Sequence, residues 1–168
     1  MGYVFNVDEI FEMAGQIERN GARFYRQMAN DISDSSIRQL MLNFAAMEDA
    51  HEKVFLSMKK GLSDQDRGKT IYDPDEETSL YLRAFADLFV FDDKEEERFT
   101  LPEGLSEKAK MRKIIRAAIN LEWESISFYT GMKVSVPKSL GKGEIDEIIR
   151  EEMRHVRLLT NNLTSLEG

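Results

Sequence analysis

The chain has 168 residues, of which 42% are apolar and 32% are charged, with a formal net charge of -8 and no cysteine. This balance is typical of one globular domain, and the acidity argues against a nucleic-acid partner bound through a basic surface. Without cysteine there can be no disulfides, thiolate nucleophiles or thiolate metal ligands. Any metal ion must therefore be held by nitrogen and oxygen.

No segment of the chain is typical of export or membrane insertion. The first residues lack a basic segment followed by a long apolar run, and no stretch reaches transmembrane length. We therefore expect a cytoplasmic protein without a membrane partner. Only three prolines and ten glycines favour a mostly helical chain.

Apolar residues at helical spacing predict a first helix over residues 7–29. Asn6 is a plausible N-cap, and Glu9 follows at the spacing of a capping box. Glu18 lies within the apolar stripe of this helix, where an isolated charge would be costly.

A second helix is expected from residue 33 or 34 to Lys60, where Gly61 supplies a stop signal. Glu48 lies beside its apolar stripe and faces inward or nearly so. Residues 7–60 are thus predicted to form a helical hairpin.

Residues 61–105 form a long connection. Within it, residues 79–91 have the pattern of a short helix, and the charged run 92–98 is interpreted as solvated. A linker of this length can climb the full height of a bundle, which favours a crossover topology over an up-down-up-down one.

A second hairpin is expected over residues 106–164. Its first helix starts at Ser106, runs to about residue 132 and carries Glu122 on its inner side, and its second helix covers 143–163. The Gly-Lys-Gly at 141–143 does not match a phosphate-binding loop.

The two hairpins carry one motif twice. Glu48 and His51 form a Glu-x-x-His pair, and Glu152 and His155 form another, which together use the only two histidines. His155 minus His51 is 104, and Glu152 minus Glu48 is also 104. A glutamate and a histidine three apart lie on one helix face, so a single metal ion can reach both.

The same offset relates other parts of the two hairpins. It carries Glu18 onto Glu122, and the pair Phe24-Tyr25 onto Phe128-Tyr129. In each hairpin the two glutamates flank a turn symmetrically, so they should lie at the same height. Two packed hairpins then bring six side chains to one layer, namely Glu18, Glu48, His51, Glu122, Glu152 and His155.

Divalent iron or manganese accepts this set of carboxylate and imidazole ligands. Two such ions carry four positive charges, which the four glutamates balance, and this explains why four carboxylates would be buried in an apolar bundle. In the usual arrangement of such sites Glu48 and Glu152 would bridge the ions, and the other four residues would each bind one ion.

Each element also has a simpler interpretation. One Glu-x-x-His pair on a helix is more often solvated than a ligand, but two pairs in register with two further glutamates favour metal binding. Tyr25 and Tyr129 are expected to pack in the core, or to donate a hydrogen bond from the hydroxyl to a ligand carboxylate. Trp123 and the methionines of the apolar stripes are expected in the core.

The repeated Glu…Glu-x-x-His pattern resembles the ferritin-like superfamily of di-iron carboxylate proteins, which are all-α four-helix bundles with a long crossover. The segments that follow the first glutamate of each hairpin, with Phe24-Tyr25 and Phe128-Tyr129, are most similar to the rubrerythrin branch. The resemblance spans nearly the whole chain except the crossover. It implies a site of two iron ions, with manganese or a mixed metal pair as the alternatives.

A further resemblance concerns Glu151. The run from Glu151 to His155 is similar to the acidic-Glu-x-Arg-His form of di-iron oxygenases, in which the leading carboxylate supports a ligand histidine. Met47 occupies the corresponding place in the first hairpin, so this support would be one-sided.

Two features depart from rubrerythrins of the peroxidase type. Those proteins usually carry a seventh glutamate one turn after the third-helix ligand, where this chain has Ser125. They also usually end in a rubredoxin-like domain with four cysteines, whereas this chain has none.

The resemblance implies a peroxidase or a ferroxidase-type oxidoreductase that reacts a buried di-iron site with O2 or H2O2. An external donor such as a rubredoxin would supply electrons, and a homodimer is expected because dimers are common in the superfamily. Two alternatives stay open: iron sequestration or delivery without turnover, and a bundle with a structural dinuclear site that manganese or zinc would serve equally well.

Overall fold

The computed structural model describes residues 5–68, 73–89 and 99–167 of the chain. The charged run 92–98 lies outside these ranges, as do the last two residues of the helix expected over 79–91. The elements of the described part are helices, which confirms the predicted all-α class.

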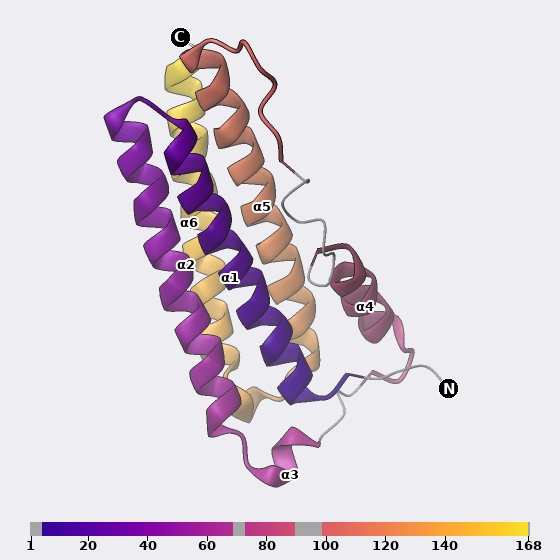
Figure 1. Cartoon of the computed structure of the whole chain (residues 1–168). Coiled ribbons are helices and arrows are strands. Elements are labelled where there is room, and N and C mark those ends of the chain that lie inside the picture. Colours follow the sequence, from indigo (N-terminus) through magenta and orange to yellow (C-terminus); the bar gives the residue numbers. More distant parts are fainter. Residues whose placement is uncertain (1–4, 69–72, 90–98, 168) are drawn as a thin grey trace.

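Four long helices form the bundle (Figure 1). They are α1 (Val7–Asp31), α2 (Ser35–Gly61), α5 (Glu107–Ser135) and α6 (Lys142–Glu167). α1 and α2 form one antiparallel hairpin, and α5 and α6 form the other. The turn between α5 and α6 contains the 3-10 helix η2 (Lys138–Leu140). Between the hairpins, α1 packs against α5 and α2 packs against α6. α6 ends four residues beyond the predicted limit of 163.

The helix starts follow the capping residues of the sequence. Asn6 accepts a hydrogen bond from the Glu9 backbone N–H at 2.8 Å, and the Glu9 carboxylate accepts one from the Asn6 N–H at 2.9 Å. Asp34 caps α2, and Ser106 caps α5. These caps satisfy amide groups that have no partner within the helix, so they set where each arm of the bundle begins.

The crossover carries two helices, α3 (Asp64–Arg67) and α4 (Glu77–Phe89). α3 is too short to produce a periodic pattern, which is why the sequence does not reveal it. α3 lies at one end of the bundle and α5 begins at the other, with α4 against the side of α5 between them (Figure 1). Two residues of α4 hold it there. The Tyr81 hydroxyl lies 2.5 Å from the Ser127 hydroxyl of α5, and the Leu82 side chain is fully buried.

The apolar core is divided into two clusters. One gathers around the first half of α1 and includes Phe11, Ile17, Phe55, Phe128 and Ile145. The other gathers around the end of α1 and includes Met28, Met41, Phe44, Ile114 and Leu159. A layer of buried polar side chains lies between the two clusters.

The prediction that Trp123 belongs to the core is wrong, because its side chain is 55% exposed. Trp123 follows Glu122 directly, so it projects about 100° around the helix from that inward-facing residue.

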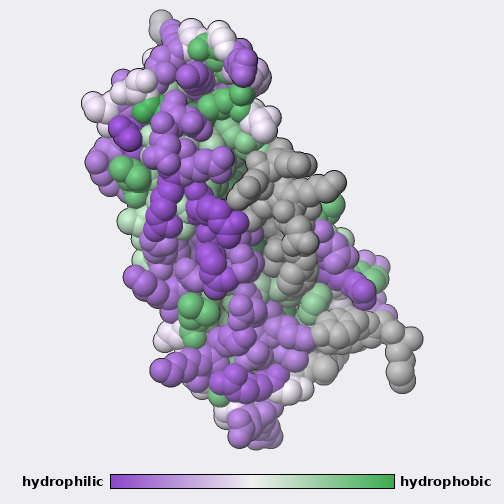
Figure 2. Space-filling view, viewed as in Figure 1, coloured by the Kyte–Doolittle hydropathy of each residue, from purple (hydrophilic) through white to green (hydrophobic). Residues whose placement is uncertain are grey.

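The face in Figure 2 is mostly hydrophilic, with scattered apolar residues. None of the helices in the described ranges has both the length and the apolar character needed to cross a membrane.

We expect Leu82→Ala to lower the free energy of unfolding by about 2–5 kcal/mol, because it removes a fully buried side chain between α4 and the bundle. Leu80→Ala on the same helix is the matched control. Leu80 is 56% exposed, so its loss should change stability by no more than about 0.5 kcal/mol. Urea unfolding followed by circular dichroism measures both, and equal midpoints would show that α4 does not unfold with the bundle.

Candidate metal centre

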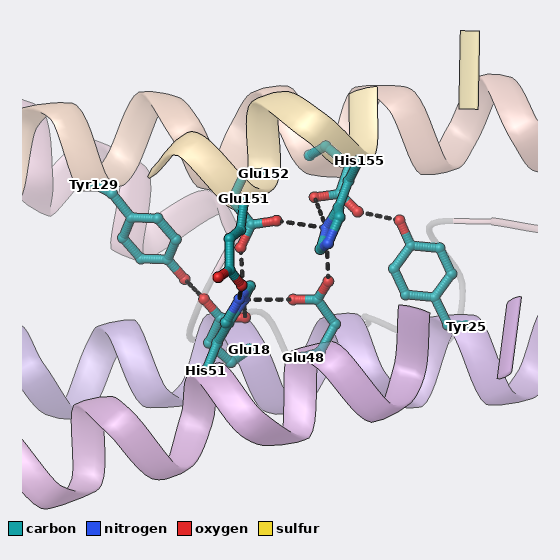
Figure 3. A network of polar contacts seen from close by, with 9 residues as sticks. Glu18, Tyr25, Glu48, His51, Tyr129, Glu151, Glu152 and His155 are labelled. Carbon is teal, nitrogen blue, oxygen red and sulfur yellow. Dashed lines mark hydrogen bonds and ion pairs between the residues drawn. The ribbon is translucent and has the colours of Figure 1, made fainter. Parts of the chain in front are cut away.

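All four helices of the bundle contribute to one buried polar layer (Figure 3). Its six side chains are each between 0% and 4% exposed, and they are Glu18 of α1, Glu48 and His51 of α2, Glu122 of α5, and Glu152 and His155 of α6. The structure therefore brings together every residue of the repeated motif. The antiparallel hairpins achieve this because each glutamate pair is spaced evenly about its turn.

One half of the layer is arranged around His51. Its Nδ1 atom lies 2.9 Å from an oxygen of Glu152, 3.5 Å from Glu18 and 3.9 Å from Glu48. His51 and the three carboxylates offer ligand atoms that all lie within 4.8 Å of one another. Such a group can hold one cation.

The other half is arranged in the same way around His155. Its Nδ1 atom lies 2.9 Å from the second oxygen of Glu152, 3.4 Å from Glu122 and 3.6 Å from Glu48. The rings of His51 and His155 are stacked with their centroids 5.9 Å apart. Glu48 and Glu152 belong to both halves, so the layer consists of two overlapping groups.

The polar atoms of this layer fit divalent cations. Among the described residues, eight buried side-chain nitrogen and oxygen atoms have no hydrogen-bond partner, and seven of them belong to these six side chains. A buried polar atom without a partner is costly, so seven of them in one place indicate a ligand that the protein itself does not supply. Carboxylate oxygen and imidazole nitrogen suit iron, manganese or zinc. The buried carboxylate and histidine cluster is thus able to bind metal.

Two of the glutamates resist ionisation in the absence of cations. Burial raises the pKa of Glu48 well above its usual value, and the carboxylates of Glu152, Glu18 and Glu122 raise it further. Burial also raises the pKa of Glu122, with Glu152 adding to the effect. Cations in the layer would remove the cause of both shifts, because they would compensate the negative charge.

The pKa values of Glu152, His51 and His155 reflect a network of opposite charges centred on Glu152. Burial opposes ionisation of Glu152, but the imidazoles of His155 and His51 beside its two oxygens outweigh burial and lower its pKa. Burial likewise opposes protonation of His51, yet Glu152 and Glu18 raise its pKa to about 11. Against the same effect of burial, Glu122 and Glu152 raise the pKa of His155 to about 9. At neutral pH both imidazoles therefore hold protons where cations would bind.

Two tyrosines hold the outer glutamates in place. Tyr25 of α1 donates a hydrogen bond to Glu122 of α5, and Tyr129 of α5 donates one to Glu18 of α1. Each bond joins the two hairpins, and the tyrosines lie at opposite sides of the layer in Figure 3. Both side chains are also fully buried, so core packing and carboxylate support occur in the same residues.

Glu151 also contacts the layer from the other hairpin. One of its carboxylate oxygens lies 2.8 Å from Nε2 of His51, on the side of the ring away from the cluster. The sequence pattern does not say which histidine Glu151 supports, and the structure shows that its carboxylate reaches His51 of α2. Packing of α6 against α2 decides this choice, which a local motif does not encode.

Sequence reasoning missed two residues that shape the layer. A Cβ atom on Gly21 of α1 would lie 3.4 Å from Cγ of Glu48, so even an alanine here would be in van der Waals contact with this side chain. The only signal was a glycine in the middle of a helical pattern, which often marks close packing. Phe44 covers the ring of His155 edge-on with centroids 4.9 Å apart, a contact that its apolar character alone did not reveal.

Comparison with known proteins places this chain in a family. Comparison with curated protein sequences finds no match. The fold is similar to the crystal structure of a Thermotoga maritima protein named as a candidate ferritin-like diiron-carboxylate protein, with a TM-score of 0.68 and 21% sequence identity over 98% of both chains. The family profile described as Rubrerythrin matches residues 9–163, which is most of the sequence. This ferritin-like bundle with its buried carboxylate and histidine layer therefore belongs to the rubrerythrin family.

Proposed function

We propose that this protein is an oxidoreductase in which a pair of iron ions reacts with O2 or H2O2 and is reduced again by an external electron donor. The observation that carries the proposal is the pair of overlapping ligand groups that share Glu48 and Glu152. A single cation would not need two histidines, each facing its own outer glutamate as well as the two shared ones. The family membership supports iron as the metal.

In this proposal the six residues divide into shared and separate ligands. Glu48 and Glu152 would contact both ions, since each offers oxygens to both histidine groups. Glu18 and His51 would bind one ion only, and Glu122 and His155 the other. The charges match, because four carboxylates balance two divalent ions in a layer that is closed to bulk water.

When bound, the iron pair would supply the electrons that reduce the oxidant. The protein's own residues set the conditions. The hydroxyls of Tyr25 and Tyr129 fix the outer carboxylates, so these glutamates keep their orientation while charge in the layer changes. The apolar clusters on both sides of the layer exclude water and limit side reactions.

A second candidate is iron binding without catalytic turnover. It is favoured by Ser125, which is buried on the inner side of α5 where peroxidase-type rubrerythrins usually have a seventh glutamate.

One experiment separates the two candidates. We expect metal-free protein loaded anaerobically with two ferrous ions per chain to show an altered iron spectrum when peroxide is added. With a chemical reductant present, an oxidoreductase should consume peroxide through many cycles. Oxidation that stops after one cycle, with iron passing to a chelator, would support sequestration, and no spectral change would defeat both candidates.

The shared and separate ligands should differ in their effect on metal content. We expect Glu48→Gln to weaken the binding of both ions and Glu18→Gln to weaken mainly the binding of one. Each affinity should fall at least about 10-fold, since loss of a group that only supports a ligand already has an effect of that size. The substitution keeps the shape and removes the charge. Elemental analysis after dialysis gives the number of ions per chain.

Glu52→Gln is the matched control for these variants. Glu52 lies one turn after Glu48 on α2 but pairs with Arg19 at 2.8 Å outside the layer. Its variant should bind as much metal as the unmodified protein. Equal losses in all three variants would contradict the assignment of ligands.

Metal binding should release protons and strengthen as pH rises. The pKa of His51 is raised to about 11 and that of His155 to about 9, so both are protonated at neutral pH and both protons must leave when the nitrogens bind cations. Below these pKa values, the metal affinity should rise about tenfold per pH unit for each proton that must leave.

Calorimetry of Mn2+ binding in two buffers with different ionisation enthalpies measures the proton release. We expect about two protons from the histidines, besides any held by Glu48 and Glu122, whose pKa values are raised. The His155→Ala variant should release fewer. An affinity that does not change between about pH 6 and about pH 8 would contradict the proposed ligands.

A further inference from the structure

The two histidines have matching contacts on the side that faces the layer. Nδ1 of His51 lies 2.9 Å from one oxygen of Glu152, and Nδ1 of His155 lies 2.9 Å from the other oxygen. The offset of 104 residues that relates His51 to His155 also relates the two outer glutamates and the two tyrosines. The ligands themselves therefore give no reason for the two cation positions to differ.

The outer sides of the two rings are different. Nε2 of His51 lies 2.8 Å from a carboxylate oxygen of Glu151. The residue related to Glu151 by the same offset is Met47, whose thioether is only a weak acceptor. The ring of His155 packs edge-on against Phe44, and the residue related to Phe44 by the offset is Ile148, which is not aromatic. One imidazole is thus supported by a carboxylate and the other is covered by an aromatic ring.

This difference affects how strongly each histidine can bind a cation. A carboxylate that accepts the outer N–H of a ligand imidazole fixes the ring and makes its inner nitrogen more basic. It also adds a negative charge near one of the two positions. Loss of such a partner typically weakens metal binding about 10–100-fold. Because the Glu151 side chain is 45% exposed, water screens it and an effect near tenfold is expected.

We propose that Glu151 is a positioning residue that makes the two cation positions unequal. The position bound by Glu18 and His51, here the His51 position, fills before the one bound by Glu122 and His155, the His155 position. The inference rests on the proposed function only in requiring that the layer hold two cations. It adds an order of filling that the repeated ligands do not predict.

The first test uses the unmodified protein, so it does not depend on the folding of a variant. Metal-free protein is crystallised with one equivalent of Mn2+, and anomalous scattering gives the occupancy of each position. We expect most of the manganese at the His51 position. Equal occupancy, or more manganese at the His155 position, would overturn the inference. Failure to bind a second equivalent would instead count against the proposed function.

The second test measures each position alone in solution. His155→Ala leaves the His51 position, and His51→Ala leaves the His155 position. Adding Glu151→Met should weaken Mn2+ binding about tenfold in the first background and much less in the second. Adding Glu151→Gln, whose amide oxygen still accepts a hydrogen bond, should have an intermediate effect. Equal weakening in both backgrounds would overturn the positioning role, because Glu151 would then favour neither cation position.

The exchanged variant, Met47→Glu with Glu151→Met, completes the design. It moves the carboxylate to the related place on α2 and leaves the net charge unchanged. We expect the occupancy at one equivalent of Mn2+ to shift toward the His155 position. An order of filling that stays the same in this variant would contradict the role of Glu151.

Discussion

Four carboxylates and two imidazoles lie at one level of a bundle whose other inward-facing residues are mostly apolar. Such a layer is costly unless cations occupy it, because the carboxylates repel one another and many of their atoms lack hydrogen bonds. Without cations this cost is reduced by the raised pKa values of both histidines, which favour protonated imidazoles, and burial also raises the pKa of Glu122. The rest of the structure serves to hold this layer together.

The fold distributes this task evenly over two related hairpins. Each hairpin contributes one outer glutamate, one shared glutamate, one histidine and one tyrosine, and each tyrosine supports a glutamate of the opposite hairpin. The two halves are therefore connected through the layer as well as through the apolar clusters on either side. The symmetry ends outside these residues, where Glu151 contacts one histidine and Phe44 packs against the other.

The features that separate this chain from peroxidase-type relatives lie beside the layer and not in it. Ser125 is buried where those proteins usually place a further glutamate, and the offset relates it to Gly21, which closely approaches Glu48. Neither of these small residues adds a carboxylate to the six side chains of the layer. The ability to bind metal thus depends on the six residues, whereas the proposed reaction also depends on the surroundings of the layer.

The sequence by itself determined the four long helices, most of their caps and the six residues of the layer. These depend on local periodicity and on a repeat offset of 104 residues, both of which can be read along the chain. Tertiary packing decided that Glu151 reaches His51, that each tyrosine crosses to the other hairpin, and that Trp123 faces solvent. Helical spacing relates residues within one helix, whereas the rotation of each helix and its contacts across the bundle follow from how all four pack together.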